Sequence, residues 1–319
     1  TPGWRKIQTG GSPAQPISRF GHAGTLVPGT SRVYIFGGMN LESVRSDMWS
    51  YGIADSSWTP VAYAGDIGPR YQADMSYAKL GDQLFLFGGN GYEEPPGAGW
   101  WFDFGSTSWR WACSGDEPYP NFQQAGRTAW IEQTSGILTY GGTYYLYELY
   151  FHWHPFWYTP LPENCAMDKE SPAGGRSGHF FEAVDDRTVL IYGGQKDDYA
   201  AHDDSWLTWW NGSTWSWQQV YPGSSPGARQ LMSSAADPAR GRAYLLGGYD
   251  DFGNERNDVW MVQGPSWTSW TLLDAGHPNP TERPRATDAV LVADPSTGYL
   301  YHFGRAASPT DPMEVWLYI

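Results

Sequence analysis

Basic residues are scarce in this chain of 319 residues. It has 20 lysines and arginines against 34 aspartates and glutamates, which gives a formal net charge of −14 at neutral pH. Binding to the phosphate backbone of a nucleic acid needs a basic face, so this balance argues against a nucleic-acid partner. It permits basic protein partners or divalent cations, and it is equally compatible with an acidic surface that is only solvated.

Long apolar runs and cysteines are also lacking. No apolar stretch reaches 18 residues, so we expect no membrane-spanning helix. The two cysteines, Cys113 and Cys165, are too few for a disulfide scaffold or a zinc site, and whether they are bonded stays open. Asn211 begins a glycosylation sequon, but Asn211–Gly212 is also a preferred hairpin turn. Neither a cytosolic nor an extracellular location is excluded.

Glycine, by contrast, is abundant and recurs at a regular interval. Six times a short apolar run ends in glycine, with steps of 51, 53, 52, 54 and 57 residues between Gly37, Gly88, Gly141, Gly193, Gly247 and Gly304. A fixed period of about 50 residues indicates one supersecondary unit used repeatedly. In five units the glycine is doubled, which permits positive φ and a close approach of two backbones.

The fifth unit shows the expected strands most clearly. Residues 229–248 predict two strands joined by a polar turn, and further strands are expected at 257–263 and 267–273. The second strand of each unit is apolar on both faces, which is typical of a strand between two packed sheets. Each unit therefore predicts one four-stranded antiparallel sheet.

Other landmarks recur with the glycines. An acidic residue stands two positions before an aromatic residue, as in Asp47/Trp49, Asp204/Trp206 and Asp258/Trp260. We expect a recurring tryptophan of the last strand to fill the gap between neighbouring sheets, at Trp58, Trp109, Trp157, Trp217 and Trp270. Sheets of this kind bury both faces when they are arranged radially.

The two ends of the chain predict how the ring closes. The sixth unit stops at its third strand, and Trp4 lies six residues before Gly10, just as Trp270 lies six residues before Gly276. We therefore expect the N-terminal strand to complete the last sheet.

The paired glycines, the "NDVW" about ten residues later, the "TSW" strand and the "PR" that opens the next unit resemble kelch repeats. The resemblance covers the whole chain. It implies a single all-β domain over residues 1–319: a six-bladed kelch β-propeller with four antiparallel strands per blade, the last blade being closed by the N-terminal strand. Unit 3 and the Gly304–Arg305 pair depart from the pattern.

We find no sequence signature of an enzyme. A nucleophile elbow, an HExxH motif, a P-loop and a GxGxxG motif are all absent from the sequence. The iron triad of plant specifier proteins, which resemble this fold, would require Glu where Gly194 stands, although Asp198 and His202 keep their spacing. We expect no cofactor, with calcium at acidic loops as the remaining alternative.

Two groups of residues are candidates for binding. The long loops after the second strands, together with the loops that lead into the next unit, should emerge on one side, which we call the loop face. There we expect Asp198, Asp250 and Asp251 of the acidic loops, together with Tyr92 and Tyr145, as possible contacts for calcium, a basic partner or, for the aromatic side chains, sugars.

Arginines that open the first strand of each unit form the second group. In kelch domains, which this chain resembles, such arginines help to grip acidic peptides; carried over, they are Arg19, Arg70, Arg127, Arg176, Arg229 and Arg285. The alternative is that each arginine pairs with the recurring acidic residue and closes its own sheet.

The sequence thus favours a non-catalytic module that binds a partner protein or peptide through the loop face. An extracellular propeller that binds or modifies glycans is the alternative. We expect a monomeric domain, which can also be one part of a larger protein.

Overall fold

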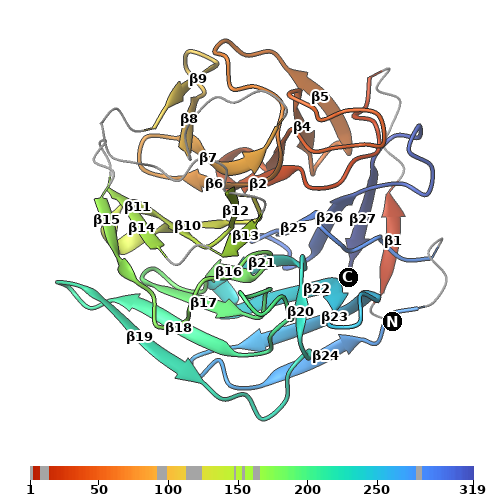
Figure 1. The fold of residues 1–319 in the computed structure, drawn as a ribbon. Helices are drawn as coiled ribbons and strands as arrows, with labels where there is room; N and C mark the ends of the chain where they lie inside the picture. Colours follow the sequence, from red (N-terminus) through yellow and green to blue (C-terminus); the bar gives the residue numbers. More distant parts are fainter. Residues whose placement is uncertain are drawn as a thin grey trace.

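The chain folds into β-sheets arranged around a central channel (Figure 1). The computed structural model describes residues 3–7, 14–91, 99–112, 124–146, 149–152, 155–160, 166–277 and 282–319. Short 3₁₀ turns connect the first and second strands of three units: η1 (Pro28–Thr30), η2 (Glu132–Thr134) and η3 (Pro238–Arg240). We call the first strand of each unit, which lines the channel, its inner strand.

The first four repeat units each form a four-stranded antiparallel sheet in chain order. Unit 1 contains β2 (Ala23–Val27), β3 (Arg32–Phe36), β4 (Met48–Gly52) and β5 (Ser57–Val61). Unit 2 contains β6 (Tyr71–Ala78), β7 (Gln83–Asn90), β8 (Gly99–Asp103) and β9 (Ser108–Trp111). Unit 3 contains β10 (Arg127–Ile131), β11 (Gly136–Tyr140), β14 (Pro155–Pro160) and β15 (Ala166–Glu170). Unit 4 contains β16 (Phe180–Ala183), β17 (Thr188–Tyr192), β18 (Ser205–Trp210) and β19 (Trp215–Val220).

The structure corrects the expected blade count. Unit 5 forms a five-stranded sheet from β20 (Arg229–Gln230), β21 (Ser233–Asp237), β22 (Arg242–Asp250), β23 (Glu255–Gln263) and β24 (Trp270–Asp274). Its first strand is interrupted at Leu231, which takes a φ of +53°, and at Met232; both pieces, β20 and β21, pair with β22. Unit 3 adds a separate two-stranded sheet of β12 (Thr143–Leu146) and β13 (Leu149–His152). The expectation of six four-stranded blades is therefore wrong: the structure has five four-stranded blades.

The N-terminal strand completes the last of these blades. That sheet contains β25 (Val290–Ala293), β26 (Leu300–Gly304), β27 (Glu314–Tyr318) and β1 (Trp4–Ile7). β1 pairs antiparallel with β27, with Trp4 opposite Tyr318, and the two strands lie side by side in Figure 1. The expected closure by the N-terminal strand is confirmed.

A closed ring of backbone hydrogen bonds surrounds the channel. Each repeat unit contributes one residue with a φ between +51° and +63°, and each N–H donates to the carbonyl oxygen of the next residue in the series Gly21, Asp288, Leu231, Gly178, Ala125, Gln72 and back to Gly21. The six N···O distances range from 2.6 to 3.0 Å. We call this ring the hub ring. It joins the inner strands without any side chain.

Aromatic side chains fill the gaps between neighbouring sheets, as predicted. Trp58 of unit 1 packs edge-on against Phe303 of the last blade, Trp109 of unit 2 packs against Phe36 of unit 1, and the ring centroids are 5.8 and 5.4 Å apart. These side chains are almost fully buried. These aromatic contacts pack each sheet against its neighbour.

Candidate functional site

Four of the predicted arginines lie where an inner strand begins, and each locks its own sheet. Their Nη1 atoms donate to the carbonyl oxygen of the first glycine of the unit's pair at 2.9 to 3.1 Å. All four side chains are buried: Arg19, Arg70, Arg176 and Arg229. Their guanidinium groups are therefore held inside the fold.

Three of these arginines also form ion pairs with the recurring acidic residue. Arg19 binds Asp47, Arg176 binds Asp204 and Arg229 binds Asp258, each through both carboxylate oxygens. The same carboxylates accept the indole N–H of Trp49, Trp206 and Trp260 at 2.7, 2.9 and 2.6 Å. This explains the spacing of two residues between acid and tryptophan in the sequence.

Arg70 differs because Gly99 stands where the other units have the acidic residue. Within the described part of the chain no carboxylate pairs with Arg70. Burial lowers the pKa of its guanidinium to about 10, and the group lies 5.8 Å from the ring centre of Trp100.

The two remaining predicted arginines occupy other positions. Arg127 lies on β10 and points across the channel, where it bonds to Asp74 and to the backbone oxygens of His179 and Met232. Arg285 lies one residue before Ala286, which takes the position of the buried arginines. The sequence carried a signal for this: the distance from arginine to glycine is 17 or 18 residues in the four regular units, but 14 from Arg127 to Gly141 and 19 from Arg285 to Gly304.

The acidic loops of units 4 and 5 lie in contact on the loop face. The backbone N–H of Ala201 donates to Oδ1 of Asp251 at 3.0 Å. Asp198 is exposed and binds His202, and this hydrogen bond lowers the pKa of the Asp198 carboxyl. The structure thus brings Asp198 and Asp251 onto neighbouring loops.

Asp250, unlike its neighbour Asp251, directs its carboxylate into its own loop. Its carboxylate is buried and accepts hydrogen bonds from Phe252 N, from Asn254 and from Arg256. Although burial opposes ionisation, these donors hold the pKa of Asp250 at about 2. Asp250 therefore shapes the loop. Among the described residues, no group of three or more His, Cys, Asp or Glu side chains is arranged to hold a metal ion.

The tips of the two acidic loops carry exposed aromatic rings that are not among the contacts predicted from the sequence. Tyr199 is 59% exposed and Phe252 is 88% exposed. The signal was present in the sequence, since each ring directly follows a pair of aspartates, in "DDY" and "DDF". Tyr92 lies outside the described residues, as does the side chain of Tyr145, whose backbone belongs to β12.

A hollow of about 450 Å³ lies beside these loops on the same face. It is lined by the start of β23, including Arg256, and by His277 and Arg285. Arg285 is the one predicted arginine that borders an open space on the loop face. A second hollow, the channel, contains the carboxylates of Asp74, Glu182 and Asp288.

Comparisons with known proteins agree with this architecture. A family model described as the KLHDC2/KLHL20/DRC7 Kelch-repeats domain matches residues 1–154. The chain is also similar to the dynein alpha chain of the flagellar outer arm from Chlamydomonas reinhardtii, with 28% identity over 132 residues; the match covers 38% of this chain and 3% of that protein. Within the described residues, no helix is long and apolar enough to cross a membrane. The repeated glycines, the radial sheets and the family model over residues 1–154 together support a kelch-repeat β-propeller.

Proposed function

We propose that this chain is a protein-interaction module that binds a partner protein or peptide through its loop face. Kelch propellers commonly mediate protein interactions. The binding surface that we assign is formed by Asp198, Tyr199, Asp251 and Phe252, and we call it the tip patch.

The observation that carries the proposal is the exposure of two aromatic rings on adjoining loops. Tyr199 and Phe252 project from loops that are tied together by the hydrogen bond from Ala201 to Asp251. Exposed aromatic side chains on a rigid support are typical anchors of protein interfaces, because they bury a large area with little loss of side-chain freedom.

The charge around the tip patch favours a partner with basic residues. The nearest cations are already paired, Lys196 with Asp204 at 2.8 Å and Arg256 with Asp250 at 2.7 Å. The carboxylates of Asp198 and Asp251 therefore dominate the field at the loop tips, and a basic peptide would be complementary to them. The partner that fits best combines an apolar side chain with a neighbouring lysine or arginine.

A peptide-display selection tests this proposal. The folded chain is screened with a random peptide library, and the enriched peptides are measured against Phe252→Ala and against Leu80→Ala. Leu80 is a matched control because it is a large apolar residue, 54% exposed, in the turn after β6, away from the loop face.

We expect Phe252→Ala to weaken binding by about 2 kcal/mol, roughly thirtyfold, and Leu80→Ala to leave it unchanged. Equal binding by both variants, or enrichment of acidic peptides, would contradict the tip patch. A glycan array run with the same sample tests the alternative that the rings stack on sugars; glycan binding lost in Phe252→Ala would replace the protein partner.

A further inference from the structure

The central channel contains a cavity of about 400 Å³ that the proposed function does not use. It is lined by all the inner strands, from the hub-ring residues Gln72 and Asp288 to Pro28 and Pro295 beyond the far strand ends. A cavity of this size is in the range of sites for small organic molecules. The hub ring borders it toward the loop face.

The cavity contains one ion pair, Asp74 with Arg127, whose two charged groups already have partners within the protein. Asp74 accepts hydrogen bonds from the backbone N–H and the hydroxyl of Thr128 at 2.7 and 3.2 Å, and it pairs with Arg127 at 3.4 Å. Arg127 is further held by two backbone oxygens. This pair leaves no net charge at its position.

Glu182 and Asp288 are two further carboxylates in the same cavity. Glu182 accepts a hydrogen bond from Ser234 at 2.6 Å, and Asp288 accepts one from Gln72 at 3.1 Å. Within the described residues, neither carboxylate has a lysine, arginine or histidine partner within ion-pair distance. Burial raises the pKa of both groups, that of Glu182 to about 7. Arg127 acts on both carboxylates only at longer range, because it forms its ion pair with Asp74.

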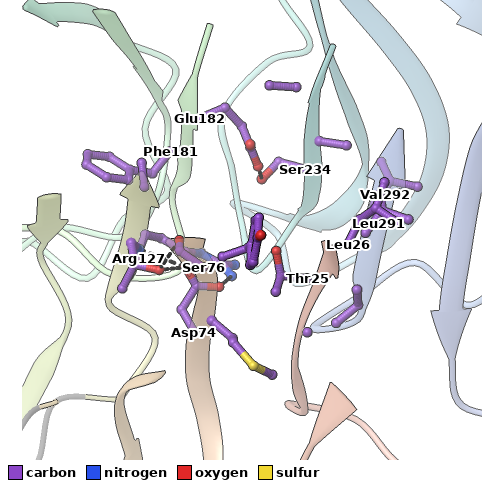
Figure 2. Close-up of a pocket in the computed structure, with 18 of the residues that line it drawn as sticks. Thr25, Leu26, Asp74, Ser76, Arg127, Phe181, Glu182, Ser234, Leu291 and Val292 are labelled. Atoms are coloured by element: carbon purple, nitrogen blue, oxygen red, sulfur yellow. Dashed lines mark hydrogen bonds and ion pairs between the residues drawn. The ribbon is translucent and has the colours of Figure 1, made fainter. Parts of the chain in front are cut away.

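The opposite side of the cavity is apolar. Figure 2 shows Leu26, Leu291 and Val292 on one side, facing the space that Glu182 and Ser234 border from another. Leu291 and Val292 are 5% and 7% exposed and line the channel, while they pack toward unit 5 and unit 1 respectively. A carboxylate beside an apolar wall is the arrangement that suits a molecule with a cationic head and a short hydrocarbon tail.

We propose that the channel binds a small amphiphilic organic cation, an alkylammonium or alkylguanidinium, with its head at Glu182 and its tail against Leu26, Leu291 and Val292. The cation would give the Glu182 carboxylate the ion-pair partner that it lacks among the described residues. The tail replaces water along the apolar wall, so affinity rises with each added methylene. This proposal is independent of the tip patch.

Binding to the channel should depend on pH through Glu182. The charged groups that face it are Asp74, Arg127 and Asp288, with Lys79 and Asp237 near the far end of the cavity. Because a cation and a proton compete for the same carboxylate, the ligand binds more tightly above pH 7 than below it.

Calorimetric titration of the folded chain with n-pentylammonium at pH 8 tests the proposal. Pentanoate and n-pentanol serve as the anionic and neutral probes of the same length. We expect one saturable site for the ammonium, binding at least about tenfold weaker at pH 5.5, and no saturable heat with pentanoate. Glu182→Gln should weaken binding about tenfold or more, whereas Glu42→Gln, an exposed carboxyl outside the channel, should not change it.

A second measurement uses only the unmodified chain, so it remains informative if Glu182→Gln does not fold. The affinities of propyl-, pentyl- and heptylammonium are compared, and we expect a rise from propyl to pentyl. Absence of saturable binding for all three at pH 8 would show that the cavity does not take such a cation. Equal binding of pentylammonium and pentanol would show that the positive charge contributes nothing; either result would overturn the proposal.

Discussion

Arg176 and Asp204 form a two-pronged ion pair, in which Nη1 to Oδ1 and Nη2 to Oδ2 each measure 3.0 Å. The arginine side chain is fully buried and the aspartate is 17% exposed. Arg176 lies in the segment before β16, and Asp204 lies directly before β18. The pair therefore ties together the two chain segments that enter these strands from the loop face of unit 4. Similar pairs at Arg19 and Arg229 repeat this bond in units 1 and 5.

Replacing Arg176 by methionine should destabilise the protein strongly. The change leaves the Asp204 carboxylate without its main partner, and breaking a buried pair in this way costs about 3–5 kcal/mol. Denaturant unfolding of Arg176→Met measures the loss. Arg187→Met, a change at an exposed arginine, is the control and should stay within about 0.5 kcal/mol of the parent. Equal stability of the two variants would refute the locking role.

Asp204 should contribute to stability in neutral but not in acid solution. Burial opposes its ionisation, but the hydrogen bonds and charge of Arg176 hold the pKa of Asp204 well below the ordinary 3.8. A carboxyl with a lowered pKa in the folded state stabilises the fold above its unfolded pKa, and this stability is lost as the pH falls through the folded pKa. We expect Asp204→Asn to be less stable than the parent at pH 7, with the gap in unfolding free energy narrowing below pH 4. A gap of constant size would argue against the ionised pair.

Glu182 should show the opposite dependence. Its folded pKa, about 7, lies above the ordinary 4.5 because burial disfavours the charged form. Below pH 4.5 Glu182 is protonated in both the folded and the unfolded state, and its burial costs no ionisation energy. As the pH rises from 4.5 through 7, the unfolded state ionises first, so the free energy of unfolding falls. Relative to the parent, Glu182→Gln should therefore gain unfolding free energy between pH 5 and pH 8. Measurements across this range would contradict the assignment if the difference did not increase with pH.

Gly37 should not tolerate a side chain. Its φ is +65°, and an added Cβ would overlap the carbonyl oxygen of Arg70 in the next unit. The left-handed conformation alone costs a non-glycine residue about 1–2 kcal/mol, and the overlap adds to it. Gly37→Ala should lower the free energy of unfolding by at least about 2 kcal/mol, measured in denaturant. Gly29→Ala, where a Cβ meets open space, is the control; an equal loss there would remove the explanation.

Much of the architecture could be predicted from the sequence because it repeats. The double glycine, the acid–tryptophan spacing and the missing fourth strand of the last unit each follow from one local rule applied along the chain. The blade count was wrong because the first strand of unit 5 pairs in two pieces on either side of Leu231, which takes a positive φ within the hub ring. The local backbone preference of leucine does not predict a positive φ.

The candidate sites were harder to predict for a related reason. Whether an arginine is buried depends on its exact register with the following glycine, which is why Arg127 reaches into the channel and Arg285 borders a hollow. The aromatic rings of Tyr199 and Phe252 could have been noticed as a repeated motif, but their exposure follows only from the contact between two loops. The channel carboxylates meet across sequence separations that no single unit reveals.

The hub ring has a consequence for the symmetry of the molecule. Each of its residues donates one hydrogen bond through its N–H and accepts one at its carbonyl oxygen in the same rotational sense, so the circuit has no first and no last member. The covalent chain, by contrast, is interrupted between β27 and β1, within one sheet. The polypeptide is thus linear while its centre is cyclic, and any local opening of one inner strand must break two links of the same circle.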